Sequence, residues 1–110
     1  MKLPHGERAF VPPEKLAGYL LSGTHPSGQP KARFFRGLGF STDSPDLLAA
    51  QLLTIARTAD GAVLSHAPHG QKYRLVGTIV THGRQTARVQ TVWIIEPGDD
   101  RPRFVTAYPV

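Results

Sequence analysis

The sequence predicts an α+β fold, in which N-terminal helices pack on a C-terminal twisted antiparallel sheet of three to four strands. In the first half, apolar residues recur at helical spacing, and in the second half the period changes to two. Helices followed by consecutive strands with short turns are typical of this class. A chain of 110 residues is large enough for one core but not for two. We therefore expect a single domain, with a helical half at 1–61 and the sheet at 62–110.

Three helices are expected in the first half. The segment 11–23 has prolines suited to a first turn, a stripe of leucines and a closing glycine. The segment 31–38 follows a Gly/Pro loop and can turn two phenylalanines toward the core. The clearest helix runs from Pro45 until Gly61 ends it, and the Ser44 side chain is expected to cap its first turn.

Three strands are expected over 72–81, 86–95 and 103–110. Short turns join them, which favours an antiparallel meander. The segment 62–71 is left open and could hold a short strand and a loop. In the middle strand every second side chain, including that of Trp93, is expected to face the helices.

The charge of the chain is unevenly distributed. Thirteen Lys and Arg against eight Asp and Glu give a net charge of +5. The stretch 61–95 contains no Asp or Glu but holds four cations, Lys72, Arg74, Arg84 and Arg88. This asymmetry predicts a positively charged face, for which nucleic acid is the commonest partner. The alternative is a soluble protein that is merely basic.

Several classes of site are disfavoured by the sequence. Without cysteine there are no disulfides and no thiolate metal sites. His66 and His69 are three residues apart, but no carboxylate lies near them, so we expect no metal and no cofactor. The longest apolar runs are too short to span a bilayer, and the first ten residues lack the apolar stretch of a secretory signal. We therefore expect a cytoplasmic protein that does not enter a membrane. The alternative is an effector secreted by a route that needs no signal, which would have the same sequence features.

The stretch HPSGQPKARFF holds the first half of a candidate site. It places His25, Lys31 and Arg33 on and just after a Gly/Pro loop. Cleavage of RNA without a metal requires proton transfer, which histidine performs near neutral pH, and fixed positive charge on the phosphate. We predict His25 and Lys31 to be catalytic and Arg33 to bind substrate. The alternative is a set of exposed charges at the start of a helix.

Hydroxyl donors for the same site are expected from the last strand. Thr106 and Tyr108 are two residues apart, so their side chains leave the same face of the sheet. We predict both to be catalytic and assign substrate binding also to Arg74 and Arg88. The alternative is that Thr106 and Tyr108 simply fill strand positions.

Several segments together resemble a family of small bacterial domains over nearly the whole chain. They are KLPHGERAFV, HPSGQPKARFF, GLGF, HGQKY and VWIIEPGDDRPRFVTAYPV. That family is similar to the barnase–EndoU–colicin–RelE (BECR) group of metal-independent ribonucleases, many of which are toxins. The resemblance implies helices followed by a twisted antiparallel sheet with the active site on its exposed face.

The resemblance also implies roles for individual residues. His25 becomes a general acid or base, Lys31 stabilises the phosphorane, and Arg33 contacts a phosphate. Thr106 and Tyr108 donate hydroxyls from a closing VTAYP strand. The EndoU pattern has a pair of catalytic histidines, and here the second is open between His69 and His82.

The leading hypothesis is a metal-independent endoribonuclease, of the toxin–antitoxin or polymorphic toxin type, that leaves a 2′,3′-cyclic phosphate. Its expected partners are RNA, with tRNA as one candidate, and a cognate antitoxin or immunity protein. The second hypothesis is a non-catalytic domain of a two-gene pair that binds RNA or protein through the basic face. A third is a domain whose strand edge pairs with a second copy in a homodimer.

Overall fold

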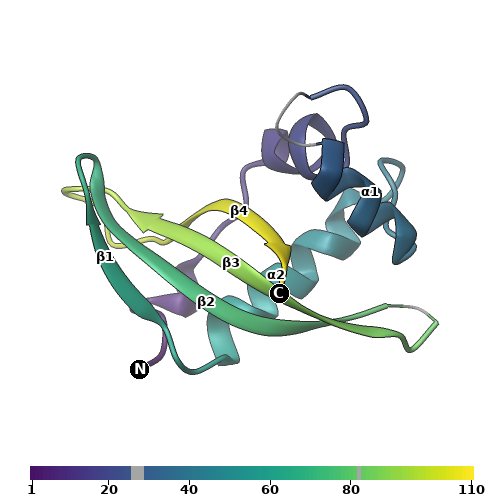
Figure 1. Cartoon of the computed structure of the whole chain (residues 1–110). Coiled ribbons are helices and arrows are strands. Elements are labelled where there is room, and N and C mark those ends of the chain that lie inside the picture. The colour runs from purple at the N-terminus through teal and green to yellow at the C-terminus, as the bar shows by residue number, and fades with distance from the viewer. Residues whose placement is uncertain (26–28, 82) are drawn as a thin grey trace.

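The computed structural model describes residues 1–25, 29–81 and 83–110. Helical segments come first and strands follow (Figure 1). The helical elements are the 3-10 turns η1 (Gly6–Arg8) and η2 (Pro13–Lys15), the π-helical turn η3 (Leu16–Leu20), and the helices α1 (Gln29–Gly37) and α2 (Pro45–Thr58). The strands are β1 (Val63–Ala67), β2 (Gly70–Val80), β3 (Thr86–Ile95) and β4 (Arg103–Pro109). This order confirms the predicted α+β class.

The four strands form one sheet in the order β1-β2-β3-β4. Each strand pairs with the next in antiparallel direction, which is the expected meander. The middle strand has the predicted bounds. The segment 62–71, which the sequence left open, holds the short strand β1, and a tight turn joins it to β2.

The segment expected to form the first helix is not an α-helix. It consists of a 3-10 turn followed by the single π-helical turn η3, in which the Leu21 amide donates to the Leu16 carbonyl five residues earlier, at 2.8 Å. This wider turn still buries the leucine stripe, because Leu16, Leu20 and Leu21 are all at most 5% exposed. The stripe was predicted correctly and the helix type was not.

The helix α2 begins as expected, with Pro45 in its first turn and Asp46 placed favourably near the helix N-terminus. Ser44 occupies the N-cap position, but its side chain makes no capping hydrogen bond. The predicted capping by the Ser44 side chain is therefore wrong.

The core lies between α2 and one face of the sheet, which we call the helix-covered face. In Figure 1, α2 lies behind the sheet. Trp93 is fully buried on this face, and its indole nitrogen donates to the Thr91 hydroxyl at 2.8 Å. The Thr91 hydroxyl in turn donates to the Leu75 carbonyl at 2.6 Å, so both buried polar side chains are satisfied. The side chains of this face are Tyr73, Leu75, Ile79, Val89, Thr91, Trp93, Phe104 and Ala107.

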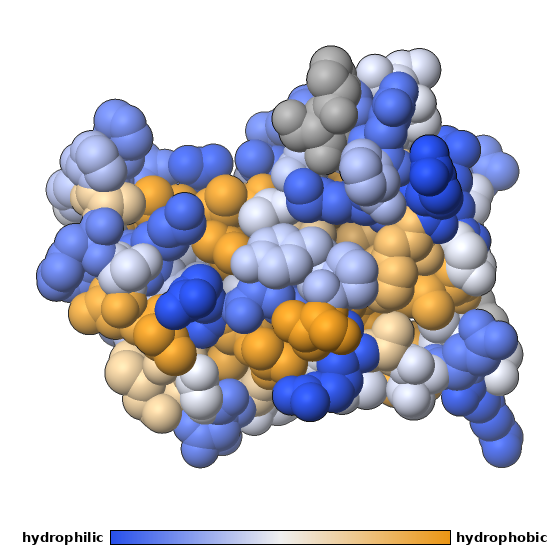
Figure 2. Space-filling model, viewed as in Figure 1, coloured by the Kyte–Doolittle hydropathy of each residue, from blue (hydrophilic) through white to orange (hydrophobic). Residues whose placement is uncertain are grey.

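The opposite side of the sheet, which we call the open face, is turned to the viewer in Figure 1. Figure 2 shows apolar side chains exposed there between hydrophilic ones. Because residues paired across antiparallel strands share a face, the register defines its central members, which are Lys72, Arg74, Val76, Thr78, Arg88, Gln90, Val92, Ile94, Arg103, Thr106 and Tyr108.

A β-bulge in β4 determines which of its side chains reach the open face. Val92 pairs with Thr106, but the next residue, Trp93, pairs with Phe104. Val105 is therefore an extra residue without a partner on β3. Phe104 is buried on the helix-covered face, and if side chains alternated regularly along β4, the Thr106 side chain would lie on that face too. Because Val105 is an extra residue, the Thr106 side chain lies on the open face instead.

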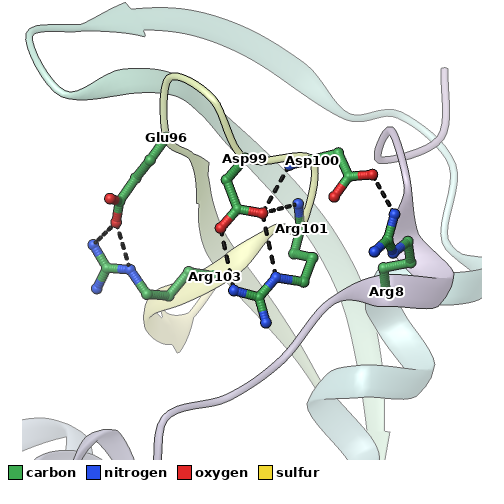
Figure 3. Close-up of polar contacts among 6 residues, drawn as sticks. All are labelled: Arg8, Glu96, Asp99, Asp100, Arg101 and Arg103. Atoms are coloured by element: carbon green, nitrogen blue, oxygen red, sulfur yellow. Dashed lines mark hydrogen bonds and ion pairs between the residues drawn. The ribbon is translucent and has the colours of Figure 1, made fainter.

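The turn between β3 and β4 gathers most of the ion pairs of the described residues (Figure 3). Glu96 pairs with Arg103 at 2.9 Å, Asp99 with Arg101 at 3.2 Å, and Asp100 with Arg8. The acidic cluster at this end is thus matched by arginines close to it. Its negative charge is consequently compensated locally, and one of the compensating arginines, Arg103, is itself a member of the open face.

The N-terminal segment covers part of the outer edge of β4. Phe10 bridges to Arg103 in parallel direction; its amide donates to the Pro102 carbonyl, and its carbonyl accepts from the Phe104 amide, both at 3.0 Å. From this point the chain continues directly into η2 and η3. The helical turns are therefore attached to the strand that carries Thr106.

Among the described residues, none of the helices combines the length and apolar character that crossing a bilayer requires.

Candidate active site

Tyr19 and Thr106 form the centre of the candidate site. Their hydroxyl oxygens are 2.8 Å apart, which is a hydrogen bond between residues 87 positions apart in the sequence. Tyr19 lies on η3 and Thr106 on β4, just after the bulge. The contact therefore joins the helical half of the chain to the last strand.

The two basic residues predicted from the HPSGQPKARFF stretch lie around the same phenol. The His25 ring packs edge-on against the Tyr19 ring, with centroids 5.0 Å apart and an interplanar angle of 74°. The Lys31 ammonium is 5.4 Å from the centre of the Tyr19 ring, and a second ammonium, that of Lys15, is 5.3 Å from it. The structure thus brings His25, Lys31 and Thr106 together, as the sequence predicts.

Tyr19, Thr106, His25 and Lys15 border a surface cavity of about 460 Å³, and the Lys31 ammonium lies near the Tyr19 ring without lining that cavity. Val105, the extra residue of the bulge, contributes to the wall beside Thr106. The wall contains one carboxylate, that of Glu14. Its lining residues are Glu14, Lys15, Gly18, Tyr19, His25, Val105 and Thr106.

Local hydrogen bonds determine where His25 lies. The Ser22 hydroxyl accepts from the His25 amide at 3.2 Å, directly after η3. The His25 carbonyl accepts from the amide of Gln29, the first residue of α1, at 3.0 Å. His25 is therefore held between the turn that carries Tyr19 and the helix that carries Lys31. The intervening residues 26–28, part of the predicted Gly/Pro loop, lie outside the described residues.

The surroundings of Tyr19 change its acidity. Partial burial raises the pKa of the phenol, but hydrogen bonds with Thr106 and Lys31 and the positive charges of Lys31 and Lys15 lower it by more in sum. The net result is a pKa below the ordinary value for tyrosine. A neutral phenol in this position is a better proton donor than a free tyrosine, because the lysines stabilise the phenolate that remains.

Tyr108, the second predicted hydroxyl, faces the same side of β4 as Thr106 and is 37% exposed. Its partner on β3 is Gln90, one row farther along the sheet. The described residues that line the cavity beside Tyr19 do not include Tyr108. The prediction that both hydroxyls leave the same face is confirmed, whereas the catalytic role of Tyr108 stays a prediction.

The three arginines predicted to bind substrate lie in different places. Arg33 is exposed on α1 and lines a separate cavity with Gln29 and Gly23. Residues two apart on an α-helix point about 200° apart, so Arg33 points away from the Tyr19 ring that Lys31 approaches.

Arg74 and Arg88 both lie on the open face. Arg74 pairs with Val92, which pairs with Thr106, so Arg74 lies in the same cross-strand row as Thr106. Two strand spacings separate their backbones, about 10 Å. Arg88 lies opposite Thr78, on the far side of the Tyr108 row. Both arginines extend the positive charge of the site across the sheet.

Tyr19 and Lys15 were missed by the sequence reasoning. Tyr19 follows Leu16 by three residues, which is the spacing of a core position in an α-helix, so the pattern hides it. Tyr19 lies in a π-helical turn, so its side chain points in a different direction from the one that α-helical spacing predicts. No feature of the local sequence reveals that turn.

The histidines considered as a second catalytic group lie elsewhere or cannot be placed. His69 lies in the turn between β1 and β2, and His82 lies outside the described residues. Among the described residues, no cluster of three or more histidine, aspartate or glutamate side chains could hold a metal ion.

Comparison with known proteins supports the fold. The chain is similar to a chain in the solved structure of a contact-dependent growth inhibition toxin–immunity protein complex from Klebsiella pneumoniae 342, with a TM-score of 0.76. The similarity covers 94% of this chain and 95% of the other, at 14% sequence identity. At this identity the likeness shows a shared fold.

A search of curated proteins found no match. A family model, by contrast, matches residues 2–110, which is nearly the whole chain. The chain belongs to the family DUF6883, described as a domain of unknown function.

Proposed function

We propose that this protein is a small endoribonuclease of the toxin type, which cleaves RNA by attack of a 2′-hydroxyl on the neighbouring phosphate and needs no metal. The observation that supports it most is the meeting of His25, Lys31 and Thr106 around the Tyr19 phenol. Tyr19, His25 and Thr106 also line one cavity. Cytoplasmic RNA, with tRNA as one candidate, is the expected substrate.

The reaction requires two proton transfers and stabilisation of charge on phosphorus. Neutral His25 accepts the proton of the 2′-hydroxyl as its oxygen forms the new bond to phosphorus. The bond from phosphorus to the 5′-oxygen then breaks, and the leaving oxygen takes the phenolic proton of Tyr19. The products are a 2′,3′-cyclic phosphate and a free 5′-hydroxyl.

The remaining groups act on charge. The Lys31 ammonium neutralises the extra negative charge of the phosphorane, and it also stabilises the Tyr19 phenolate left after proton donation. Thr106 holds the phenol in place and can donate its own hydroxyl to a phosphate oxygen. In this scheme Tyr19 supplies the second acid/base group that the sequence left open between His69 and His82.

Cleavage itself tests this proposal. Purified protein is incubated with tRNA and with total RNA in EDTA, at several pH values between about 5 and 9. The products are examined for 2′,3′-cyclic phosphate ends. We expect cleavage in EDTA, and its absence at every pH would refute the proposal.

Variants of His25 and Lys31 test the assigned roles. His25→Ala and Lys31→Met should each lower the cleavage rate by about 10²- to 10⁴-fold, the range typical of general acid–base and charge-stabilising groups. Arg57→Ala and His66→Ala, on exposed positions of α2 and β1, serve as matched controls and should cleave at the wild-type rate. Equal rates for all four variants would leave His25 and Lys31 without a role.

The hydroxyl of Thr106 has its own test. Thr106→Val keeps the shape of the side chain but removes the oxygen that bonds Tyr19, and should slow cleavage by about 10- to 100-fold, as expected for a lost hydrogen bond in a charged site. The control is Thr78→Val, at an exposed position of the same sheet face.

A second candidate function is that of a non-catalytic partner in a two-gene pair. The structure with the similar fold is described as a complex of a toxin with its immunity protein, and the similarity by itself does not distinguish the two roles. Either role involves a cognate partner protein. Binding of RNA or of an acidic protein that weakens steeply with salt, without any cleavage product, would select this alternative.

A further inference from the structure

The strands carry four aromatic side chains, and the two faces of the sheet divide them. Tyr73, Trp93 and Phe104 lie on the helix-covered face and are at most 4% exposed. Tyr108 lies on the open face and is 37% exposed. One ring of the four is therefore available to a ligand.

We propose that Tyr108 is a stacking platform for an unpaired base adjacent to the phosphate held at Thr106. The substrate is then single-stranded RNA or an unpaired segment of a folded RNA. This inference rests on the proposed ribonuclease function and adds a base subsite to it. Tyr108 thereby acts through its ring, not through the hydroxyl for which the sequence singled it out.

The position of Tyr108 fits this role. It follows Thr106 by two residues after the bulge, so both side chains leave the same face about 7 Å apart. A base next to a phosphate at Thr106 can reach the ring across this distance. A duplex cannot offer such a base, because its bases are paired and stacked on one another.

The surroundings of Tyr108 suit a nucleic-acid strand. Arg74 lies in the row of Thr106 on one side, and Arg88 lies beyond the Tyr108 row on the other. The sequence contains no Asp or Glu between 61 and 95 or between 101 and 110. An aromatic ring flanked by cations, without carboxylates on these strands, is the combination that proteins use to bind single strands.

The test uses binding in the absence of cleavage. The probe is a fluorescein-labelled, single-stranded 2′-O-methyl oligonucleotide, which lacks the attacking hydroxyl, and affinity is measured by fluorescence anisotropy. Tyr108→Ala should weaken binding by about 5- to 100-fold, corresponding to the loss of one base–aromatic stack. Tyr108→Phe keeps the ring and should restore affinity to within about twofold of the wild type, since stacking does not use the hydroxyl.

Two further measurements keep the proposal open to refutation. The same sequence as a 2′-O-methyl duplex should bind more weakly than the single strand and should be insensitive to Tyr108→Ala. Arg74→Ala should reduce the dependence of log affinity on log salt by about 0.7, the value for one phosphate contact on a single strand, whereas Arg57→Ala should not. The far-UV circular dichroism and melting temperature of each variant show that its fold is intact.

The outcomes separate this inference from the proposed function. If Tyr108→Ala binds the probe as tightly as Tyr108→Phe, or if duplex and single strand bind alike, the stacking subsite is wrong even where RNA is cleaved. If the probe binds in the predicted way but unmodified RNA is never cut, the subsite stands and the nuclease proposal fails. If no oligonucleotide binds at low salt, the subsite is again wrong, and the open face is left for a protein partner.

Discussion

The Tyr19 phenol lies where two lysine ammonium groups and a threonine hydroxyl meet, so its ionisation is sensitive to all three. Lys31 contributes both a hydrogen bond and a positive charge, whereas Lys15 contributes charge. The other two tyrosines of the chain, Tyr73 and Tyr108, lie on the sheet. Because its surroundings lower the pKa of Tyr19, the ionisation of this tyrosine can be followed by spectroscopy without any substrate.

Ionisation of the tyrosines can be followed by ultraviolet absorbance of the phenolate. In the wild type, one of the three tyrosines should ionise at lower pH than a free tyrosine, whose pKa is about 10. Tyr19→Phe should remove that step, and Lys31→Met should move it to higher pH. If the step survives in Tyr19→Phe, another tyrosine is responsible.

The same shift affects stability. Because the pKa of Tyr19 is lower in the folded protein than in the unfolded chain, the unfolded chain binds more protons between the two values, and folding becomes more favourable as pH rises through that range. The difference in unfolding free energy between wild type and Tyr19→Phe should therefore shift in favour of the wild type between about pH 8 and 10. Urea unfolding at both pH values measures it, and a constant difference would contradict the shift.

At the level of secondary-structure elements, the approach of α2 to the sheet depends on Gly77 in β2. A Cβ atom at this position would lie 2.6 Å from two side-chain carbons of Ile55 and 2.9 Å from a third. Cβ atoms essentially never make non-bonded contacts this short, so either the Ile55 side chain or the backbone of α2 or β2 would have to shift. The glycine is thus required for packing at this point, where β2 and α2 meet.

Gly77→Ala should lower the free energy of unfolding by about 1–3 kcal/mol, the usual cost of overpacking a core. Gly37→Ala, at the end of α1 where a Cβ would meet nothing within 4 Å, is the matched control and should be neutral or slightly stabilising. Both values come from urea unfolding followed by circular dichroism. Equal stability of the two variants would show that α2 can shift without cost.

The bulge in β4 was not predicted from the sequence. The alternation of apolar residues predicted the strand and its bounds to within one residue. The prediction that the side chains of Thr106 and Tyr108 lie on the same face of the sheet was also correct. Which face they share depends on Val105, an extra residue with no recognisable signature in the sequence. Whether the Thr106 hydroxyl lies on the open face or is buried against the helices therefore required the structure.

Across the whole molecule, one core joins the helical half to the sheet, and its single tryptophan lies at the centre. Trp93 is fully buried among side chains from both halves, next to Phe104 at 5.3 Å between ring centroids. With one core of this kind, the helices and the sheet should lose their structure together.

Unfolding in urea should therefore give the same midpoint by Trp93 fluorescence and by far-UV circular dichroism. Circular dichroism reports on helices and strands alike, whereas fluorescence reports on the centre of the core. Two separated transitions would show that the N-terminal turns unfold independently and would weaken the assignment of Tyr19 to a fixed site. Light scattering on the same samples tests the predicted homodimer.

Prediction from the sequence succeeded where a residue pattern has a direct structural meaning. The change of period from helical to two gave the α+β order, and the leucine stripe at Leu16 and Leu20 gave the buried side of the first segment. The sequence also singled out His25, Lys31 and Thr106, which the structure places around one phenol, while their catalytic roles stay predictions. Tyr19 was not predicted as a site residue, because its partner Thr106 is 87 positions away and because it lies in a π-helical turn.

The π-helical turn at Leu16–Leu20 has a consequence for how this site can be gained or lost. Such a turn holds one residue more than an α-helical turn, so removing a single codon from it would let the backbone relax to the ordinary helix. Each residue step on an α-helix rotates a side chain by about 100°, and Tyr19 would then swing away from Thr106. Homologues that lack this one residue should accordingly keep the sheet and the leucine core but lose the hydroxyl pair, and such a deletion is a simple route to an inert version of the domain.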